Sequence, residues 1–143
     1  MPYRLLVDLD SFLFELRSTY EIVGKFLGGF FGRVLGRKLQ EAEVIAALEA
    51  SGNDTKWIGM LRRERVVFFH QTAPWIAFEV ERGEPFKYNL VVLKKNARDL
   101  SNAEDYVRLH EYRAILQGFE GSMEFLAGWL VDEIEKVEGP APA

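Results

Sequence analysis

The sequence has no cysteine, and only two histidines and five prolines among its 143 residues. Without cysteine the chain has no disulfide framework and no thiolate metal site. Two histidines and scattered carboxylates show no spacing typical of a metal centre, so we expect neither a metal nor another cofactor. No apolar stretch approaches the ~20 residues of a membrane-spanning helix, and no signal peptide opens the chain. These absences favour a cytoplasmic protein that stays out of membranes.

An excess of positive charge is also lacking, since the formal net charge is −4. We therefore do not expect a surface that wraps nucleic acid by bulk electrostatics. Any contact with RNA would be local, and two basic clusters are candidates for binding phosphate. They are Arg62, Arg63 and Arg65 in one segment and Lys94, Lys95 and Arg98 in another.

Apolar residues are plentiful, at 48% of the chain, and eleven of them are phenylalanine. A chain of this size with this much apolar surface predicts one domain with a substantial core. We place that domain at residues 1–138 and expect residues 139–143, GPAPA, to form a disordered tail.

Apolar residues recur every three or four positions in three stretches, which predicts helices. The stretches are residues 12–34, 39–51 and 109–137. We expect the first helix to begin at Phe12 after a cap at Asp10 or Ser11, and the last to begin near Asn102 or Ala103. Glycines also recur every four residues in the first helix, at positions 24, 28, 32 and 36. We interpret them as a groove in which another helix packs closely, and the glycines of the last helix are its candidate contacts.

Between these helical stretches the apolar period changes to two. Residues 76–80 and 86–92 alternate apolar and polar side chains on either side of a turn at 82–85. This pattern predicts a two-stranded β-hairpin, at about residues 75–93, with one buried face that packs on the helices. An apolar pocket under it, lined by Trp75, Phe78 and Tyr88, is a candidate ligand site. The predicted fold is mainly α: an up-and-down bundle of four to five helices, with the hairpin inserted before the last long helix.

Residues 61–75, LRRERVVFFHQTAPW, are the stretch in which a function can be argued. Pro74 disfavours helix at the residue before it, so a helix beginning near Asn53 or Asp54 would end near Gln71. In such a helix the side chains of Arg63 and His70 point in directions around the helix axis that differ by only ~20°. Those of Arg65 and His70 differ by ~140°. The alternative is a buried strand, because Val66 to Phe69 are all β-branched or aromatic. The functional interpretation below requires the helix.

An imidazole and guanidinium groups on one helix suit phosphate chemistry. Imidazole titrates near neutral pH and can give or take a proton. Guanidinium offers a fixed fork of donors to phosphate oxygens. The same residue types are also typical of a solvated helix face with a histidine near its end.

The predicted arrangement has four helices, arginines followed by a histidine in the third helix, and a hairpin before a long last helix. It resembles the HEPN domains. These are small helical bundles common in prokaryotic defence and toxin–antitoxin systems, and their signature is Arg, four to six residues, then His. Arg65 to His70 fits with four intervening residues and Arg63 to His70 with six. Two positions depart from the pattern. Val66 stands where a polar residue often follows the arginine, and Thr72 stands where the toxin subgroup has tyrosine.

The resemblance implies a metal-independent endoribonuclease that acts as a homodimer. His70 would be the acid/base at the ribose 2′-hydroxyl, and Arg65 or Arg63 would hold the phosphate. RNA and a protein antitoxin would then be partners. The alternative is a non-catalytic HEPN-like module for dimerisation or partner binding through the first and last helices.

Overall fold

The computed structural model describes residues 2–70, 75–83, 85, 87–93, 97 and 99–139. Within these ranges the side chains of residues 2–3, 65–70, 104 and 138 are not described. The elements in order are α1 (Pro2–Val34), α2 (Glu41–Ala50), α3 (Lys56–His70), β1 (Trp75–Glu81), β2 (Lys87–Leu93), the 3-10 turn η1 (Ala103–Asp105), β3 (Tyr106–Arg108) and α4 (Leu109–Glu138). The expected mainly helical class is confirmed, and the expected tail lies outside the described residues from position 140 onward. No helix in the described ranges is both long enough and apolar enough to cross a membrane.

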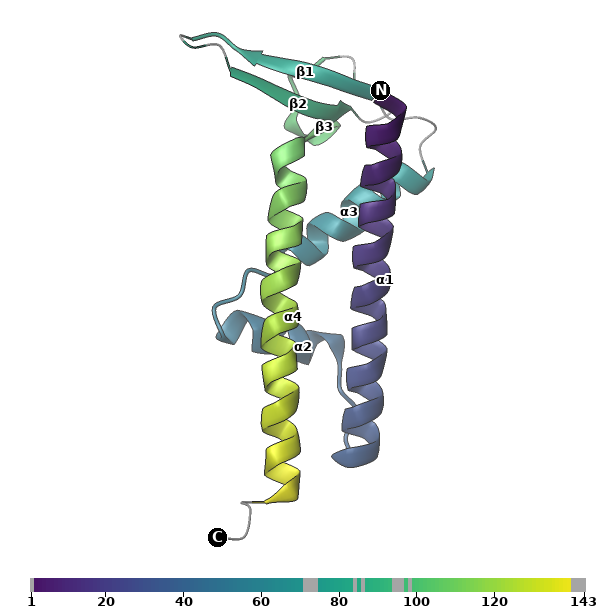
Figure 1. Cartoon of the computed structure of the whole chain (residues 1–143), viewed down its shortest axis with the longest axis vertical. Helices are drawn as coiled ribbons and strands as arrows, with labels where there is room; N and C mark the ends of the chain where they lie inside the picture. Colours follow the sequence, from purple (N-terminus) through teal and green to yellow (C-terminus); the bar gives the residue numbers. More distant parts are fainter. Residues whose placement is uncertain are drawn as a thin grey trace.

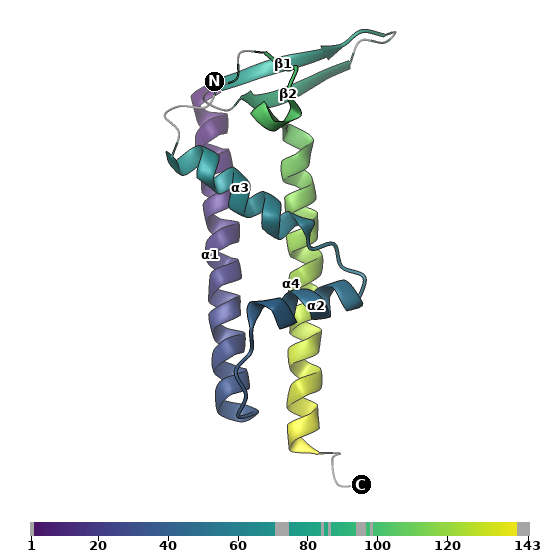
Figure 2. The same cartoon turned by 180° about the vertical axis from the view of Figure 1, so that it is seen from behind.

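Two long helices, α1 and α4, lie side by side and form the frame of the molecule (Figure 1). Helices α2 and α3 cross them on one face, and the sheet lies at one end (Figure 2). Both α1 and α4 begin at the sheet end, so they run in the same direction. In an up-and-down bundle of four helices the first and fourth helices are antiparallel, whereas α1 and α4 are parallel. The arrangement arises because α3 leads the chain back to the sheet end before α4 begins.

The core is divided into two clusters along the long helices. The cluster near the sheet contains Leu13 of α1, Trp57 of α3, Ile115 of α4, and Val92 and Val107 of the sheet. The cluster at the far end joins residues of α1, α2 and α4, namely Leu27, Phe31, Val44, Leu48 and Leu126. Met123 of α4 packs against both clusters and so connects them.

The starts of both long helices differ from the expectation. Helix α1 begins at Pro2, ten residues before Phe12, because Leu5, Leu6 and Leu9 extend its apolar stripe toward the sheet. The predicted cap at Asp10 or Ser11 is therefore wrong, since both residues lie inside the helix.

Helix α4 begins at Leu109 rather than near Asn102 or Ala103. The preceding residues form η1 and the short strand β3, in which Tyr106 and Val107 are buried. The sheet consequently has three antiparallel strands in the order β1-β2-β3, not two.

The glycines of α1 do not form the expected helix-packing groove. A methyl group added at Gly24, Gly28 or Gly32 would meet no atom within 4 Å. The close approach occurs instead at Gly118 of α4, where an added Cβ would lie 2.4 Å from Cδ1 of Trp57. Glycine is thus required at position 118, where α3 packs on α4, because any side chain there would overlap the indole of Trp57.

The register of the sheet determines which side chains share a face. Phe78 pairs with Leu90, and Val80 pairs with Tyr88, across β1 and β2. Side chains alternate along a strand, so Trp75 points to the face opposite Phe78 and Tyr88. The expected single pocket lined by all three aromatic residues is therefore wrong.

Candidate functional site

The third helix has the conformation that the phosphate-binding interpretation requires. Helix α3 extends from Lys56 to His70, so residues 66–69 are helical and the strand alternative is excluded. The carboxylate of Asp54 accepts a hydrogen bond from the Lys56 backbone N–H at 2.9 Å, which satisfies one donor at the start of this helix. Positions 63 and 70 therefore lie two turns apart on one helix, with bearings that differ by ~20°.

Arg62 is held in an ion pair between helices. It pairs with Glu41 of α2, which also accepts a hydrogen bond of 3.1 Å from the hydroxyl of Tyr20 in α1. Burial, followed by the charge of Glu41 and the hydrogen bond to it, raises the pKa of Tyr20 to about 12. This arrangement ties three helices together, so the predicted phosphate ligand Arg62 has a structural contact.

Arg63 has a different environment. Its Nε donates to Oε1 of Glu64 at 3.0 Å, and 52% of its side chain remains exposed. The remaining donors of the guanidinium are therefore accessible to an anion from solvent. The side chains of Arg65 and His70, and all of Lys94, Lys95 and Arg98, lie outside the described structure.

Glu64 is a fully buried carboxyl residue inside the α3–α4 contact. It lies three residues after Leu61 and seven after Trp57, which places it on the buried stripe of α3. Its charge contributes to raising the pKa of Tyr112 in α4, after the larger effect of burial. The hydroxyl of Tyr112 has no hydrogen-bond partner among the described residues.

A groove of about 340 Å³ lies beside Arg62, between α1, α2 and α3. Its apolar lining includes Val23, Leu27 and Leu39, and its rim carries Arg17, Lys25 and Arg62. Arg17 pairs with Glu21 at 2.5 Å, as Arg62 does with Glu41, so much of the positive charge at the rim is neutralised. The groove is therefore not a concentrated site for phosphate. Within the described ranges, no three His, Cys, Asp or Glu side chains are grouped as metal ligands would be.

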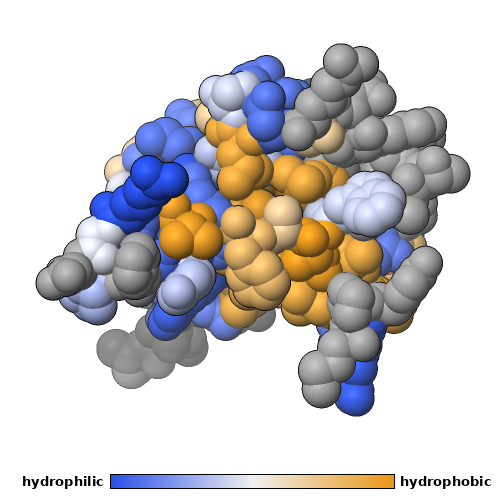
Figure 3. Space-filling view, turned by 90° about the horizontal axis from the view of Figure 1, so that it is seen from above, coloured by the Kyte–Doolittle hydropathy of each residue, from blue (hydrophilic) through white to orange (hydrophobic). Residues whose placement is uncertain are grey.

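Apolar side chains gather on the surface at the sheet end of the molecule (Figure 3). The exposed large apolar residues of the sheet include Phe78 at 67%, Val80 at 50% and Tyr88 at 67%. These three share a face with Val92 and Val107, which are buried in the core. The turn end of the hairpin projects past α4 in both views of the fold (Figures 1 and 2). On this sheet face Val92 and Val107 are therefore part of the core, whereas the three residues nearer the hairpin turn are exposed to solvent. We call Phe78, Val80 and Tyr88 the hairpin patch.

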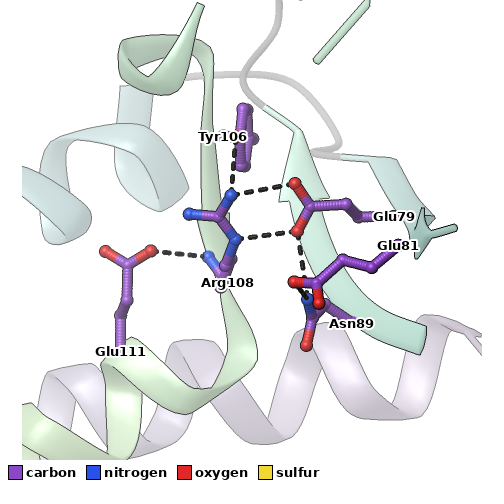
Figure 4. A network of polar contacts seen from close by, with 6 residues as sticks. All are labelled: Glu79, Glu81, Asn89, Tyr106, Arg108 and Glu111. Carbon is purple, nitrogen blue, oxygen red and sulfur yellow. Dashed lines mark hydrogen bonds and ion pairs between the residues drawn. The ribbon is translucent and has the colours of Figure 1, made fainter. Parts of the chain in front are cut away.

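The opposite sheet face carries a polar network centred on Arg108 (Figure 4). Arg108 of β3 donates twice to Glu79 of β1, with both distances 2.8 Å, and once to the Tyr106 hydroxyl at 3.0 Å. These bonds from Arg108 are the main reason that the pKa of Glu79 is lowered. The backbone N–H of Arg108 donates to Glu111 of α4 at 3.1 Å. The network fixes the hairpin to β3 and to the start of α4.

The sequence patterns did not reveal these interactions in advance. The burial of Glu64 was not predicted either, although its spacing from Trp57 and Leu61 matches the buried stripe and could have signalled it. The contacts of Arg62 with Glu41 and of Arg108 with Glu79 join residues 21 and 29 positions apart. No local period signals such pairs. Comparisons of the chain with protein-family models, with curated proteins and with solved structures found no match.

Proposed function

We propose that the chain is a non-catalytic protein-binding module that acts as a homodimer. Such a module is the alternative to the ribonuclease that the HEPN resemblance implies. The observation that carries the proposal is the hairpin patch. Its three large apolar side chains are exposed on the sheet face whose Val92 and Val107 are part of the core. Burying them against another protein would remove this apolar surface from water, which is the main driving force for association.

The charges of the described residues favour a protein partner over RNA. The net charge of the chain is −4, and the side chain of Arg62 pairs with a carboxylate. Binding to nucleic acid depends on cations that are available to neutralise phosphates. A partner that contributes apolar surface does not need them.

The proposal is tested by the mass of the protein in solution at micromolar concentration. We expect twice the 16.4 kDa of one chain for the wild type. The double variant Phe78→Ser/Val80→Ser should shift the mass toward that of the monomer. The matched control is Ile22→Ser/Phe26→Ser, which alters exposed apolar residues of α1 instead. A wild-type protein that is monomeric throughout would overturn the proposal.

The control variant also separates two versions of the dimer. If only Ile22→Ser/Phe26→Ser dissociates it, the contact is made by the exposed side of α1, as a dimer through the first and last helices would require. The homodimer would then stand, and the hairpin patch would not be its contact.

A second candidate function is the metal-independent ribonuclease. The observation that favours it is the continuity of α3 through His70, which keeps Arg63 and His70 on one helix. In this candidate the exposed donors of Arg63 hold the phosphate, and His70 moves the proton at the 2′-hydroxyl.

The ribonuclease is tested by incubating single-stranded RNA with the protein in EDTA. Cleavage should be lost in His70→Ala and weakened in Arg63→Ala. It should be kept in Arg113→Ala, which removes an exposed arginine of α4. Intact RNA with the wild type, or cleavage that persists in His70→Ala, would exclude this function.

A further inference from the structure

The outer edge of the sheet is formed by β1. The strand order is β1-β2-β3, so β1 pairs with β2 on one side, and the described structure provides no strand on its other side. Figures 1 and 2 show β1 on the side of the sheet away from α4, with the start of β1 beside the start of α1. Alternate backbone N–H and C=O groups of an edge strand point outward and can pair with another strand.

Natural edge strands are usually short, or they carry charges, prolines or bulges that prevent pairing with another chain. Strand β1 has seven residues, and its register with β2 is unbroken from Trp75 to Glu81. Its charged residues, Glu79 and Glu81, are on only one face. The other face carries Ile76, Phe78 and Val80, two of which belong to the hairpin patch. This edge lacks the usual protection on its apolar face.

We propose that β1 pairs antiparallel with β1 of a second copy, around a twofold axis at Phe78, to form a continuous six-stranded sheet. The inference rests on the proposed homodimer and names its contact. In such a sheet the apolar faces of the two hairpins become one surface. Phe78 then lies beside Phe78 of the second copy, and Ile76 lies opposite Val80 of that copy.

The sequence of β1 selects this register. Phe78 is the central residue of the strand, so an axis there pairs all seven residues with their counterparts. In that register Glu79 faces Ala77 of the second copy, and Glu81 faces Trp75. A shift of the axis to Glu79 would shorten the overlap and place two Glu79 carboxylates directly opposite each other, which is unfavourable. The register with the longest overlap therefore opposes no like charges.

The charge of Glu79 is partly offset within each copy. Its carboxylate receives two hydrogen bonds from the guanidinium of Arg108 (Figure 4). A bidentate contact of this kind holds the side chain in place and offsets its charge. The central carboxylate of β1 is consequently no obstacle to a second strand at this edge.

The absence of cysteine from the chain allows a direct test by cross-linking. Residues opposite each other in antiparallel strands have Cα atoms ~4.5–5.5 Å apart, which is within the range of a disulfide. Phe78→Cys should therefore form a disulfide-linked dimer under mild oxidation with glutathione disulfide. Phe78 is exposed, so this change opens no cavity in the core.

Tyr88→Cys is the matched control. Tyr88 has the same exposed fraction and lies on the same face, but on β2. In the proposed sheet the two β2 strands are three strand spacings, or ~14 Å, apart, so the two copies of residue 88 are at least that far apart, which is too far for a disulfide. We expect Phe78→Cys to cross-link about tenfold faster than Tyr88→Cys. Circular dichroism of both variants would establish that each is folded.

Equal rates of cross-linking for the two variants would overturn this inference. Faster cross-linking in Glu79→Cys than in Phe78→Cys would overturn it as well, because it would place the axis at Glu79. If the wild type is dimeric and Phe78→Cys does not cross-link, the inference fails while the proposed homodimer stands. If the wild type is monomeric, both fail.

Discussion

At the scale of single residues, Trp57 is the central contact of the core near the sheet. Its ring packs edge-on against Tyr20 of α1 and Phe119 of α4, with centroid distances of 5.4 and 5.6 Å. Its Nε1 donates to the buried hydroxyl of Ser122 at 2.9 Å. One side chain of α3 thereby contacts both long helices and has its polar atom satisfied.

The position of Trp57 leads to a prediction about Gly118. In Gly118→Ala the added methyl would overlap the buried indole, so we expect the free energy of unfolding to fall by about 1–3 kcal/mol. The control is Gly128→Ala in the same helix, where an added methyl meets nothing within 4 Å. That variant should gain up to about 1 kcal/mol from helix propensity. Urea denaturation compares them, and equal effects would show that the contact with Trp57 does not limit this site.

The buried tyrosines predict a loss of stability in alkali. Burial, followed by nearby carboxylates, raises the pKa of both Tyr112 and Tyr20, the latter to about 12. The unfolded chain releases these protons near pH ~10, whereas the folded chain keeps them. The stabilisation is therefore complete below pH ~10 and is lost as the pH rises through the folded pKa values.

Tyr112→Phe tests this pH dependence. Removing a buried hydroxyl without a described partner should leave the stability at neutral pH unchanged or slightly higher. It should also flatten the decrease in stability measured by urea denaturation between about pH 8 and about pH 11. Tyr88→Phe, on the exposed hairpin patch, is the control and should keep the wild-type slope. A Tyr112→Phe slope as steep as that of the wild type would contradict the prediction.

At the scale of elements, Arg108 connects the sheet to the helical frame. Its three-residue strand β3 pairs with the inner half of β2, and its guanidinium reaches across β2 to β1. A two-stranded hairpin alone is marginally stable in water. The contacts of Arg108 are therefore expected to limit the movement of β1.

Arg108→Gln should increase hydrogen exchange of the β1 amides relative to those of α1. The cause is the loss of the two bonds to Glu79. Because the pKa of Glu79 is lowered, the stabilisation from these bonds is complete above the unfolded pKa of this carboxyl and is lost as the pH falls through its folded pKa. Protection of the β1 amides, measured by mass spectrometry relative to the intrinsic exchange rate at each pH, should thus fall in acid for the wild type as well. Arg113→Gln is the control, because it alters an exposed arginine of α4. Unchanged protection of β1 in Arg108→Gln would show that β2 alone holds the strand.

At the scale of the whole molecule, the arrangement of α1 and α4 separates this chain from a simple bundle. The two helices run in the same direction and are bridged by α2 and α3, which lie on one face of the pair (Figure 2). The sheet at one end and α2 toward the other give two core clusters, and Met123 contacts both. The hairpin therefore extends from one end of an elongated frame, and the proposed contact through the edge of β1 would lie away from α2 (Figure 1).

Much of the local structure followed from the sequence. The period of three to four predicted α2 and most of α1 and α4, and the turn residues marked the end of α2, where Gly52 has a φ of +83°. Alternation predicted the strands β1 and β2. Pro74 predicted that a third helix would end near Gln71, with a strand at residues 66–69 as the open alternative, and α3 is helical through His70. These features depend on neighbours a few residues away, which the sequence displays directly. The HEPN resemblance and the roles of Arg63, Arg65 and His70 are still predictions.

Only the tertiary structure decided the features that depend on residues distant along the chain. Tyr106–Arg108 is a strand because β2 offers an edge, although its residues read equally well as the start of a helix. Gly118 is packed and Gly28 is open because α3, not α1, approaches α4 closely. The partners of Arg62 and Arg108 are likewise set by how the elements pack. Local periodicity specifies helices and strands, whereas packing specifies which of their residues meet.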